Sequence, residues 1–221
     1  QINYLETVDA NTIVIGGFQR PHYYRTCPPL RAAVFTSSDG FKTVQRTNVI
    51  LAVPPAPRTR YPDFFITVGA GFVFALRDYE GMLDPTTTVD FYYISFASLI
   101  NVAAREENQR RIDATAVGSM PGKGKFRCLE IPYSSTSFAV LRGDRNNIRI
   151  DIYDIANGGA LRTVRVQSQL ATSFPPPIAQ YLLLDGSRTA LLQSNTGAKL
   201  SLDLETGLMR ALLPFIPASN Q

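Results

Sequence analysis

The residues that could do acid–base or nucleophilic chemistry are few in this chain. Its only histidine, His22, lies in a stretch rich in proline and tyrosine that we expect to be a loop. A serine nucleophile activated by histidine would have to use His22, and no Gly-x-Ser-x-Gly turn is present to hold such a serine. We therefore predict no catalytic residue and lean toward a protein that is not an enzyme.

Carboxylates and thiols are also poorly spaced for chemistry. Residues 144–147 (Asp-Arg-Asn-Asn) lack the spaced acidic positions and the final glutamate of a calcium loop. Glu106 and Glu107 could act as an acid–base pair only if the fold placed another carboxylate opposite them. Cys27 and Cys128 do not have the spacing of zinc ligands, and we expect two free thiols or, alternatively, one long-range disulfide. No metal and no cofactor are predicted.

The glycine- and lysine-rich stretch from Gly118 to Lys125 invites comparison with a phosphate-binding loop. Such a loop requires Gly-x-x-x-x-Gly-Lys-Ser/Thr between a strand and a helix. Here Lys123 is followed by Gly124 and then by a strand-like segment. We interpret the stretch as a mobile basic connector.

Two short stretches mix cationic side chains with tyrosine rings, a composition typical of protein interfaces. The predicted binding residues are His22, Tyr23, Tyr24 and Arg25 in the first stretch and Arg58, Arg60 and Tyr61 in the second. We favour a protein partner for them. Tyrosine rings with scattered acids leave carbohydrate binding or processing open, and rings that can stack on bases leave nucleic acid as a further alternative. The net charge of +4 is too small to favour nucleic acid.

The elements that must position these side chains are shown best by a pattern written twice in the last third of the chain. Residues 152–158 match residues 201–207, which lie 49 positions later. The last six positions of each copy read as an apolar residue, an aspartate, an apolar residue, two variable positions and a glycine. An aspartate at a strand end bonds nearby backbone amides, and a glycine supplies the positive φ of a turn. The predicted turn residues are Asp154, Gly158, Asp203 and Gly207.

These two copies resemble the third-strand motifs of β-propeller repeats of the WD40 or quinoprotein-like type. The resemblance is best over residues 126–215 and implies four short strands in each repeat, as in a propeller blade. It also implies a scaffold for protein–protein interaction.

The whole chain can be divided in the same way. We expect a single all-β domain over residues 1–221, a β-propeller-like array of about four four-stranded antiparallel units. The clearer units are 126–166 and 178–215, and the weaker ones are about 5–53 and 62–117. These units could belong to a larger ring and could associate with further blades from a second copy or another chain, since open sheet edges favour association. The alternative is an irregular β-sandwich.

Three local predictions concern the first half. Residues 32–36 and 41–44 are predicted as a hairpin around an Asp-Gly turn. Residues 53–62 hold four prolines and are predicted as a surface connection. Residues 98–112 are either a helix capped by Ser98, with supporting Glu–Arg pairs, or a charged extended hairpin.

Composition sets the remaining bounds. Hydrophobic residues make up 45% of the chain and charged residues 18%, which indicates a globular protein. No segment approaches the roughly 18 apolar residues that a membrane span requires. The chain begins with Gln1, so we expect a processed product or a fragment. The compartment is open, and two free thiols would favour an intracellular one.

Overall fold

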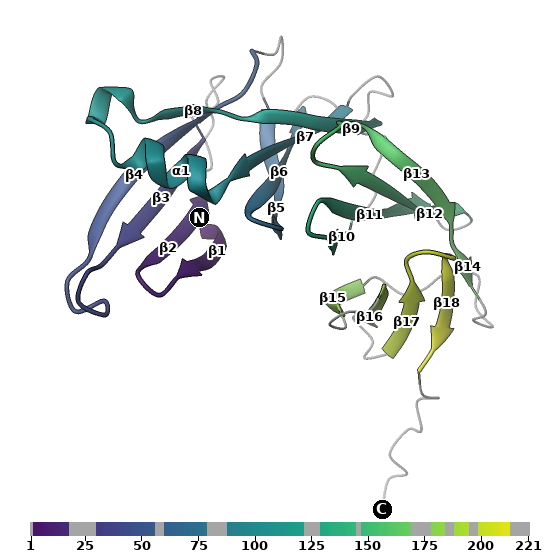
Figure 1. The fold of residues 1–221 in the computed structure, drawn as a ribbon. Helices are drawn as coiled ribbons and strands as arrows, with labels where there is room; N and C mark the ends of the chain where they lie inside the picture. Colours follow the sequence, from purple (N-terminus) through teal and green to yellow (C-terminus); the bar gives the residue numbers. More distant parts are fainter. Residues whose placement is uncertain are drawn as a thin grey trace, which may run out of the picture. The chain divides into compact units, whose positions relative to one another are not determined.

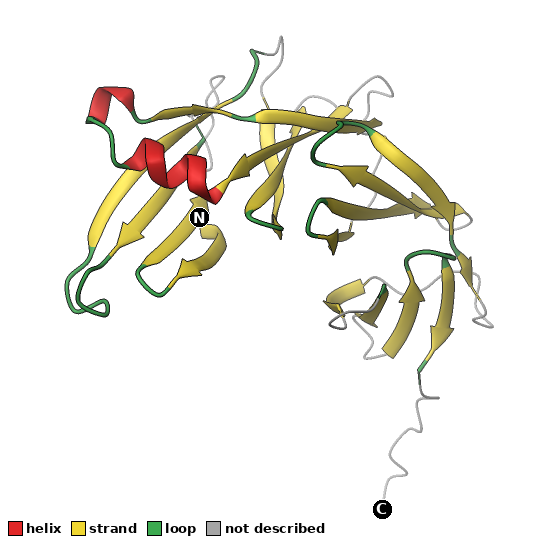
Figure 2. Cartoon of the chain, in the orientation of Figure 1, coloured by secondary structure: helices red, strands yellow, loops and turns green. Residues whose placement is uncertain are grey.

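The computed structural model describes residues 2–17, 30–55, 60–78, 88–121, 129–144, 147–168, 178–183, 188–194 and 199–212. They form an all-β structure with one short α-helix (Figures 1 and 2). The strands make four sheets, which we call sheets A to D in chain order, and each sheet contains four strands in an antiparallel meander. The predicted propeller-like array of about four four-stranded units is confirmed.

Sheets A and B come from the first half of the chain. Sheet A has the order β1 (Ile2–Asp9), β2 (Thr12–Gly17), β3 (Arg31–Thr36) and β4 (Gln45–Ala52), and a short parallel strand, β8 (Arg111–Asp113), pairs with β4. Sheet B has the order β5 (Arg60–Val68), β6 (Gly71–Asp78), β7 (Thr88–Ser95) and β9 (Thr115–Pro121).

Sheets C and D come from the second half. Sheet C has the order β10 (Leu129–Ser134), β11 (Ser137–Asp144), β12 (Asn147–Asp154) and β13 (Ala160–Arg165). Sheet D has the order β15 (Ile178–Leu183), β16 (Thr189–Ser194), β17 (Lys199–Asp203) and β18 (Leu208–Ala211), and the two-residue strand β14 (Gln167–Ser168) pairs in parallel with β18.

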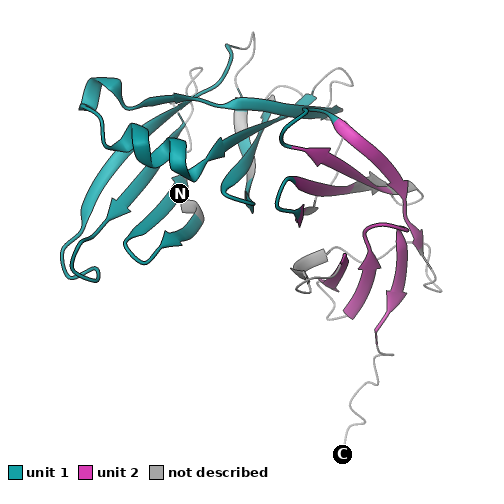
Figure 3. Cartoon of the chain, viewed as in Figure 1, with its two compact units in different colours: residues 1–125, 134–136, 155–159 teal, residues 126–133, 137–154, 160–221 magenta. Residues whose placement is uncertain are grey.

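The chain divides into two compact units, shown in Figure 3. One comprises residues 1–125, 134–136 and 155–159, and the other comprises residues 126–133, 137–154 and 160–221. The prediction of a single domain stays a prediction.

Each unit has its own apolar core, because adjacent sheets bury their alternating apolar faces against each other. In the first unit, sheets A and B share a core rich in aromatic rings. The Phe74 ring stacks on the rings of Phe65 and Tyr92, with ring centres 5.7 Å and 5.6 Å apart. In the second unit, sheets C and D share a core of aliphatic residues, including Ile150, Ile152, Leu200 and Leu202.

The helix α1 (Phe96–Ala103) is shorter than the predicted helical stretch and starts earlier. Its N-cap is Ser95, whose Oγ accepts a hydrogen bond from the Ser98 backbone N–H at 3.2 Å, so the prediction of Ser98 as the cap is wrong. Its buried face ends at Ala103, and the polar residues that follow form a 3-10 turn (Glu107–Gln109) and then β8.

Other boundaries also differ from the predictions. Residues 41–44 do not form a strand, because β4 begins only at Gln45. Arg60 to Pro62 belong to β5 rather than to a connection, and the proline is tolerated because β5 is an edge strand with a register shift after Pro62. Residues 118–121 belong to β9 rather than to a connector. Residues 122–128, with Cys128, and residues 18–29, with Cys27, lie outside the described residues.

Candidate functional site

Most of the predicted binding residues lie outside the part of the chain that the structure describes. His22, Tyr23, Tyr24, Arg25 and Arg58 fall in undescribed stretches, and only the backbone of Tyr61 is described, within β5. Arg60 is therefore the one member of the two predicted stretches whose side chain is placed.

Arg60 is held within sheet B. Its Nη2 lies 2.9 Å from Asp90 Oδ2, and its Nη1 donates a hydrogen bond to Tyr92 Oη at 3.0 Å. About a fifth of each charged side chain is exposed (20% and 22%), so water screens the ion pair only in part. Burial raises the pKa of the Tyr92 hydroxyl, which keeps this hydroxyl protonated. These bonds fix the guanidinium of Arg60 on the sheet.

The two predicted aspartate corners have the same backbone geometry. Asp154 ends β12 opposite Ser137, and Asp203 ends β17 opposite Thr189, which are the first residues of β11 and β16. The residue after each aspartate donates its backbone N–H to a carbonyl oxygen. The accepting carbonyl belongs to the residue just before β11 or β16. These two bonds, both 2.9 Å, are Ile155 N to Thr136 O and Leu204 N to Arg188 O.

The corner of sheet D is a compact acceptor site for backbone amides. Asp203 Oδ1 accepts hydrogen bonds from the backbone N–H groups of Glu205 and Thr206, both at 2.8 Å. The Thr206 amide is the main reason that the pKa of the Asp203 carboxyl is lowered. Gly207 and Gly158 both have left-handed φ values, of 75° and 65°. Each corner therefore turns the chain at a glycine.

Two exposed arginines lie beside this corner, together with a tyrosine and a glutamate that contact them. We call this group the Tyr133 cluster; it consists of Tyr133, Arg162, Arg188 and Glu205. Arg188 Nη1 lies 2.5 Å from Glu205 Oε2, and Arg162 Nη1 lies 3.9 Å from Glu205 Oε1. Arg162 Nη2 also donates a hydrogen bond to Tyr133 Oη at 3.2 Å. The Arg188 guanidinium carbon lies 5.5 Å from the centre of the Tyr133 ring.

The electrostatics of the Tyr133 cluster follow from this arrangement. The hydrogen bond to Glu205 raises the pKa of Arg188, so this guanidinium stays charged. Arg162, Arg188 and Glu205 expose 40%, 56% and 48% of their side chains, so the three charges are open to a partner. The Tyr133 ring packs against the core shared by sheets C and D and gives the arginines a rigid base.

Two further findings bound the chemistry of the described residues. Nowhere among them do three or more histidine, cysteine, aspartate or glutamate side chains come close enough together to hold a metal ion. Within the same residues, no helix has both the length and the apolar character needed to cross a bilayer.

Comparison with known proteins does not assign the chain to a family. No protein-family model matches it, and neither does any curated protein sequence. Among solved structures, it is similar to an exo-β-1,3-galactanase from Phanerochaete chrysosporium, with 13% identity, a TM-score of 0.48 and coverage of 94% of this chain and 48% of that one. It is also similar to BamB from Moraxella catarrhalis, with 11% identity, a TM-score of 0.37 and coverage of 92% and 49%.

A prolyl endopeptidase is similar at 15% identity and a TM-score of 0.45, with coverage of 92% of this chain and 25% of that one. The chain thus spans about half the length of the galactanase and of BamB, and a quarter of the endopeptidase. Membership of the WD40 or quinoprotein-like families stays a prediction.

Proposed function

We propose that this chain is a non-enzymatic protein–protein interaction module and that the Tyr133 cluster binds an acidic segment of the partner. The observation that carries the proposal is that one tyrosine contacts two exposed arginines beside a single carboxylate: Arg188 lies over the Tyr133 ring, and Arg162 donates a hydrogen bond to the Tyr133 hydroxyl. Arginine and tyrosine are the residue types that dominate binding energy at protein interfaces. The two stretches predicted from the sequence, His22–Arg25 and Arg58–Tyr61, are proposed as additional contacts.

The chemistry of the partner follows from Glu205. Its carboxylate lies near both guanidinium groups, and arginine pairs with carboxylates through two parallel hydrogen bonds. Because the Arg–Glu pairs are exposed and screened by water, they contribute little to stability, so exchanging Glu205 for a carboxylate of the partner costs little. An acidic peptide is therefore the ligand class that fits the cluster.

Fluorescence anisotropy with labelled peptides tests the proposal. The probes are a peptide rich in aspartate and glutamate and a peptide of equal length in which asparagine and glutamine replace these residues. We expect the acidic peptide to bind, and Arg162→Ala and Arg188→Ala each to weaken its binding about tenfold, as expected for a lost charge-assisted hydrogen bond. Glu205→Gln should strengthen binding, because it removes the carboxylate that competes for both arginines.

Arg210→Ala is the matched control, since Arg210 is an exposed arginine on β18 of the same unit and lies outside the cluster. It should leave binding unchanged. Equal affinity of both peptides, or equal effects of all three arginine variants, would overturn the proposal. Tighter binding of single-stranded DNA, with an affinity that falls steeply with salt, would favour nucleic acid instead.

A further inference from the structure

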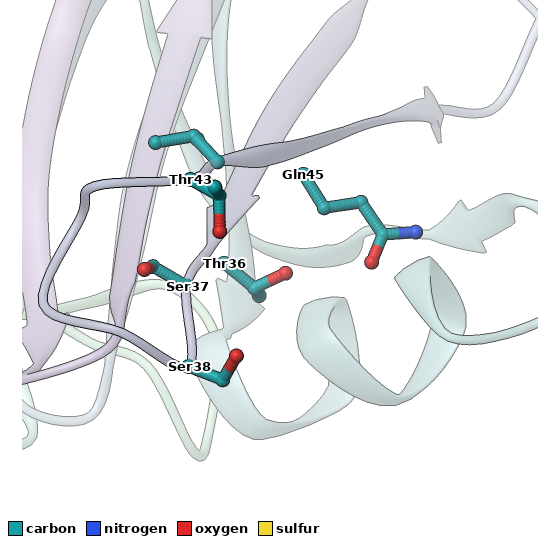
Figure 4. A pocket seen from close by; sticks show the side chains of 6 residues that line it. Thr36, Ser37, Ser38, Thr43 and Gln45 are labelled. Carbon is teal, nitrogen blue, oxygen red and sulfur yellow. The ribbon is translucent and has the colours of Figure 1, made fainter.

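A hollow of about 460 Å³ lies in sheet A where β3 ends and β4 begins. It is lined by Thr36, Ser37, Ser38, Thr43, Val44 and Gln45, and Figure 4 shows these side chains around it. Its volume is within the range of small-molecule sites. Five of the six lining residues carry a hydroxyl or an amide, and none of the six is charged.

The hollow is held open by a network centred on Asp39. Asp39 Oδ1 accepts hydrogen bonds from Ser37 Oγ at 2.8 Å and from the Thr43 backbone N–H at 2.9 Å, and Oδ2 accepts one from Thr43 Oγ1 at 2.6 Å. Ser37 Oγ in turn accepts the Phe41 N–H at 2.8 Å. Asp39, Ser37 and Thr43 therefore serve the loop itself.

The loop also contains a strained residue. Phe41 has a φ of 65°, a conformation that costs a residue with a side chain about 1–2 kcal/mol. Such strain persists where surrounding bonds hold the backbone, and it occurs often at ligand sites. The strain at Phe41 is thus a second observation, beside the hollow itself, that is typical of a ligand site.

Three other lining residues have polar groups that are uncommitted. Among the described residues, the side chains of Thr36, Ser38 and Gln45 make no hydrogen bond. Thr36 and Gln45 are paired directly across the β3–β4 ladder, so their side chains leave the same face about 4.5–5.5 Å apart at Cβ. Thr36, Ser38 and Gln45 together offer a ligand two hydroxyls and one amide, which are groups that can both donate and accept hydrogen bonds.

We propose that this hollow binds a neutral, hydroxyl-rich small molecule of the saccharide class. Hydroxyls and a primary amide match the alternating donors and acceptors of a sugar ring, and an uncharged lining gives no preference for a charged ligand. Val44, of which 50% is exposed, provides an apolar surface for the C–H groups of the ring. The site is independent of the Tyr133 cluster and of the proposed protein partner.

Saturation-transfer difference NMR on the full chain tests this proposal. The probes are neutral monosaccharides (glucose, galactose and mannose), with glucuronic acid and glucosamine as charged comparators. We expect at least one neutral sugar to bind at millimolar concentration and no charged comparator to bind more tightly. Thr36→Val and Gln45→Leu should each weaken binding about three- to tenfold, the effect of one neutral hydrogen bond.

Matched controls separate binding from folding. Thr115→Val and Gln109→Leu make the same chemical changes at exposed positions outside the hollow and should leave binding unchanged. Thermal unfolding of each variant shows whether the fold is retained, and Ser38→Ala, at an exposed loop position, serves if Thr36→Val fails to fold. Absence of any sugar signal, or sugar binding that Gln45→Leu and Ser38→Ala both leave intact, would overturn the proposal.

Discussion

Asp154 and Asp203 occupy the same register position in two successive sheets. Each is the last residue of the third strand of its sheet and pairs with the first residue of the second strand, Ser137 or Thr189. Both strand partners carry a hydroxyl. The similarity of residues 152–158 to residues 201–207 therefore corresponds to equivalent corners in sheets C and D.

The two corner glycines differ in their surroundings, which gives a matched pair of substitutions. A Cβ at Gly207 would clash with the Arg165 carbonyl oxygen and lie 2.9 Å from Val164 Cγ1, whereas a Cβ at Gly158 would meet nothing closer than 3.7 Å. Gly158→Ala should therefore cost only the positive-φ penalty, about 1–2 kcal/mol. Gly207→Ala should cost at least about 1 kcal/mol more, because the new methyl is overpacked.

Urea unfolding followed by circular dichroism measures both costs. Equal losses in the two variants would show that the Arg165 backbone moves away without penalty.

Asp39 makes stability depend on pH in the acid range. Hydrogen bonds from Thr43 and Ser37 lower the pKa of this carboxyl from 3.8 to about 2. A carboxyl with a lowered folded-state pKa contributes stability that is fully present above pH 4 or so and is lost as the pH falls through about 2. Thermal unfolding at stepped pH should show that Asp39→Asn flattens this part of the profile. Thr43→Val removes one of the bonds and should have a smaller effect, and unchanged profiles in both variants would refute the assignment.

Phe41 should reverse the usual order of alanine and glycine. Both Phe41→Ala and Phe41→Gly remove the ring, but only glycine adopts a φ of 65° without strain. We expect Phe41→Gly to be more stable than Phe41→Ala by about 1 kcal/mol in urea unfolding. The same comparison in a regular strand favours alanine, so an alanine variant as stable as the glycine variant would mean that the loop relaxes.

Arg60 can be assigned a structural or a binding role by a double-mutant cycle with Asp90. If the ion pair stabilises sheet B, then Arg60→Ala and Asp90→Ala should show a coupling energy of about 1–2 kcal/mol in unfolding experiments. Tyr92→Phe tests the separate hydrogen bond from Arg60. A coupling near zero would free Arg60 for the role in partner binding that the sequence predicts.

The fold could be predicted where local chemistry and packing agree. The pattern of an aspartate followed by a glycine at residues 152–158 and 201–207 coincides with the ends of β12 and β17 and with the positive φ values of Gly158 and Gly207. The prediction of a strand was wrong where a side chain forms hydrogen bonds with the backbone and so competes with strand pairing. Phe41 to Val44 have strand-like composition, yet hydrogen bonds from Thr43 to Asp39 hold this stretch in a loop.

The candidate sites could not be predicted, for a different reason. The Tyr133 cluster combines residues of β10 and β13 with the residue just before β16 and the second residue after β17. No spacing in one sequence reveals that these positions meet. The hollow depends on which of several hydroxyls remain uncommitted, and that follows only from the hydrogen bonds of Asp39. Tyrosine and arginine enrichment identifies the type of residue that forms interfaces but not its position.

The short parallel strands β8 and β14 have a consequence for how the protein comes apart. Only Ala114 separates β8, on the margin of sheet A, from β9 in sheet B, and only Val166 separates β13 in sheet C from β14, on the margin of sheet D. In each unit, one continuous run of backbone therefore takes part in both sheets. Unfolding of one sheet removes an edge strand from the other. Sheets A and B should lose their structure in a single cooperative step, and so should sheets C and D.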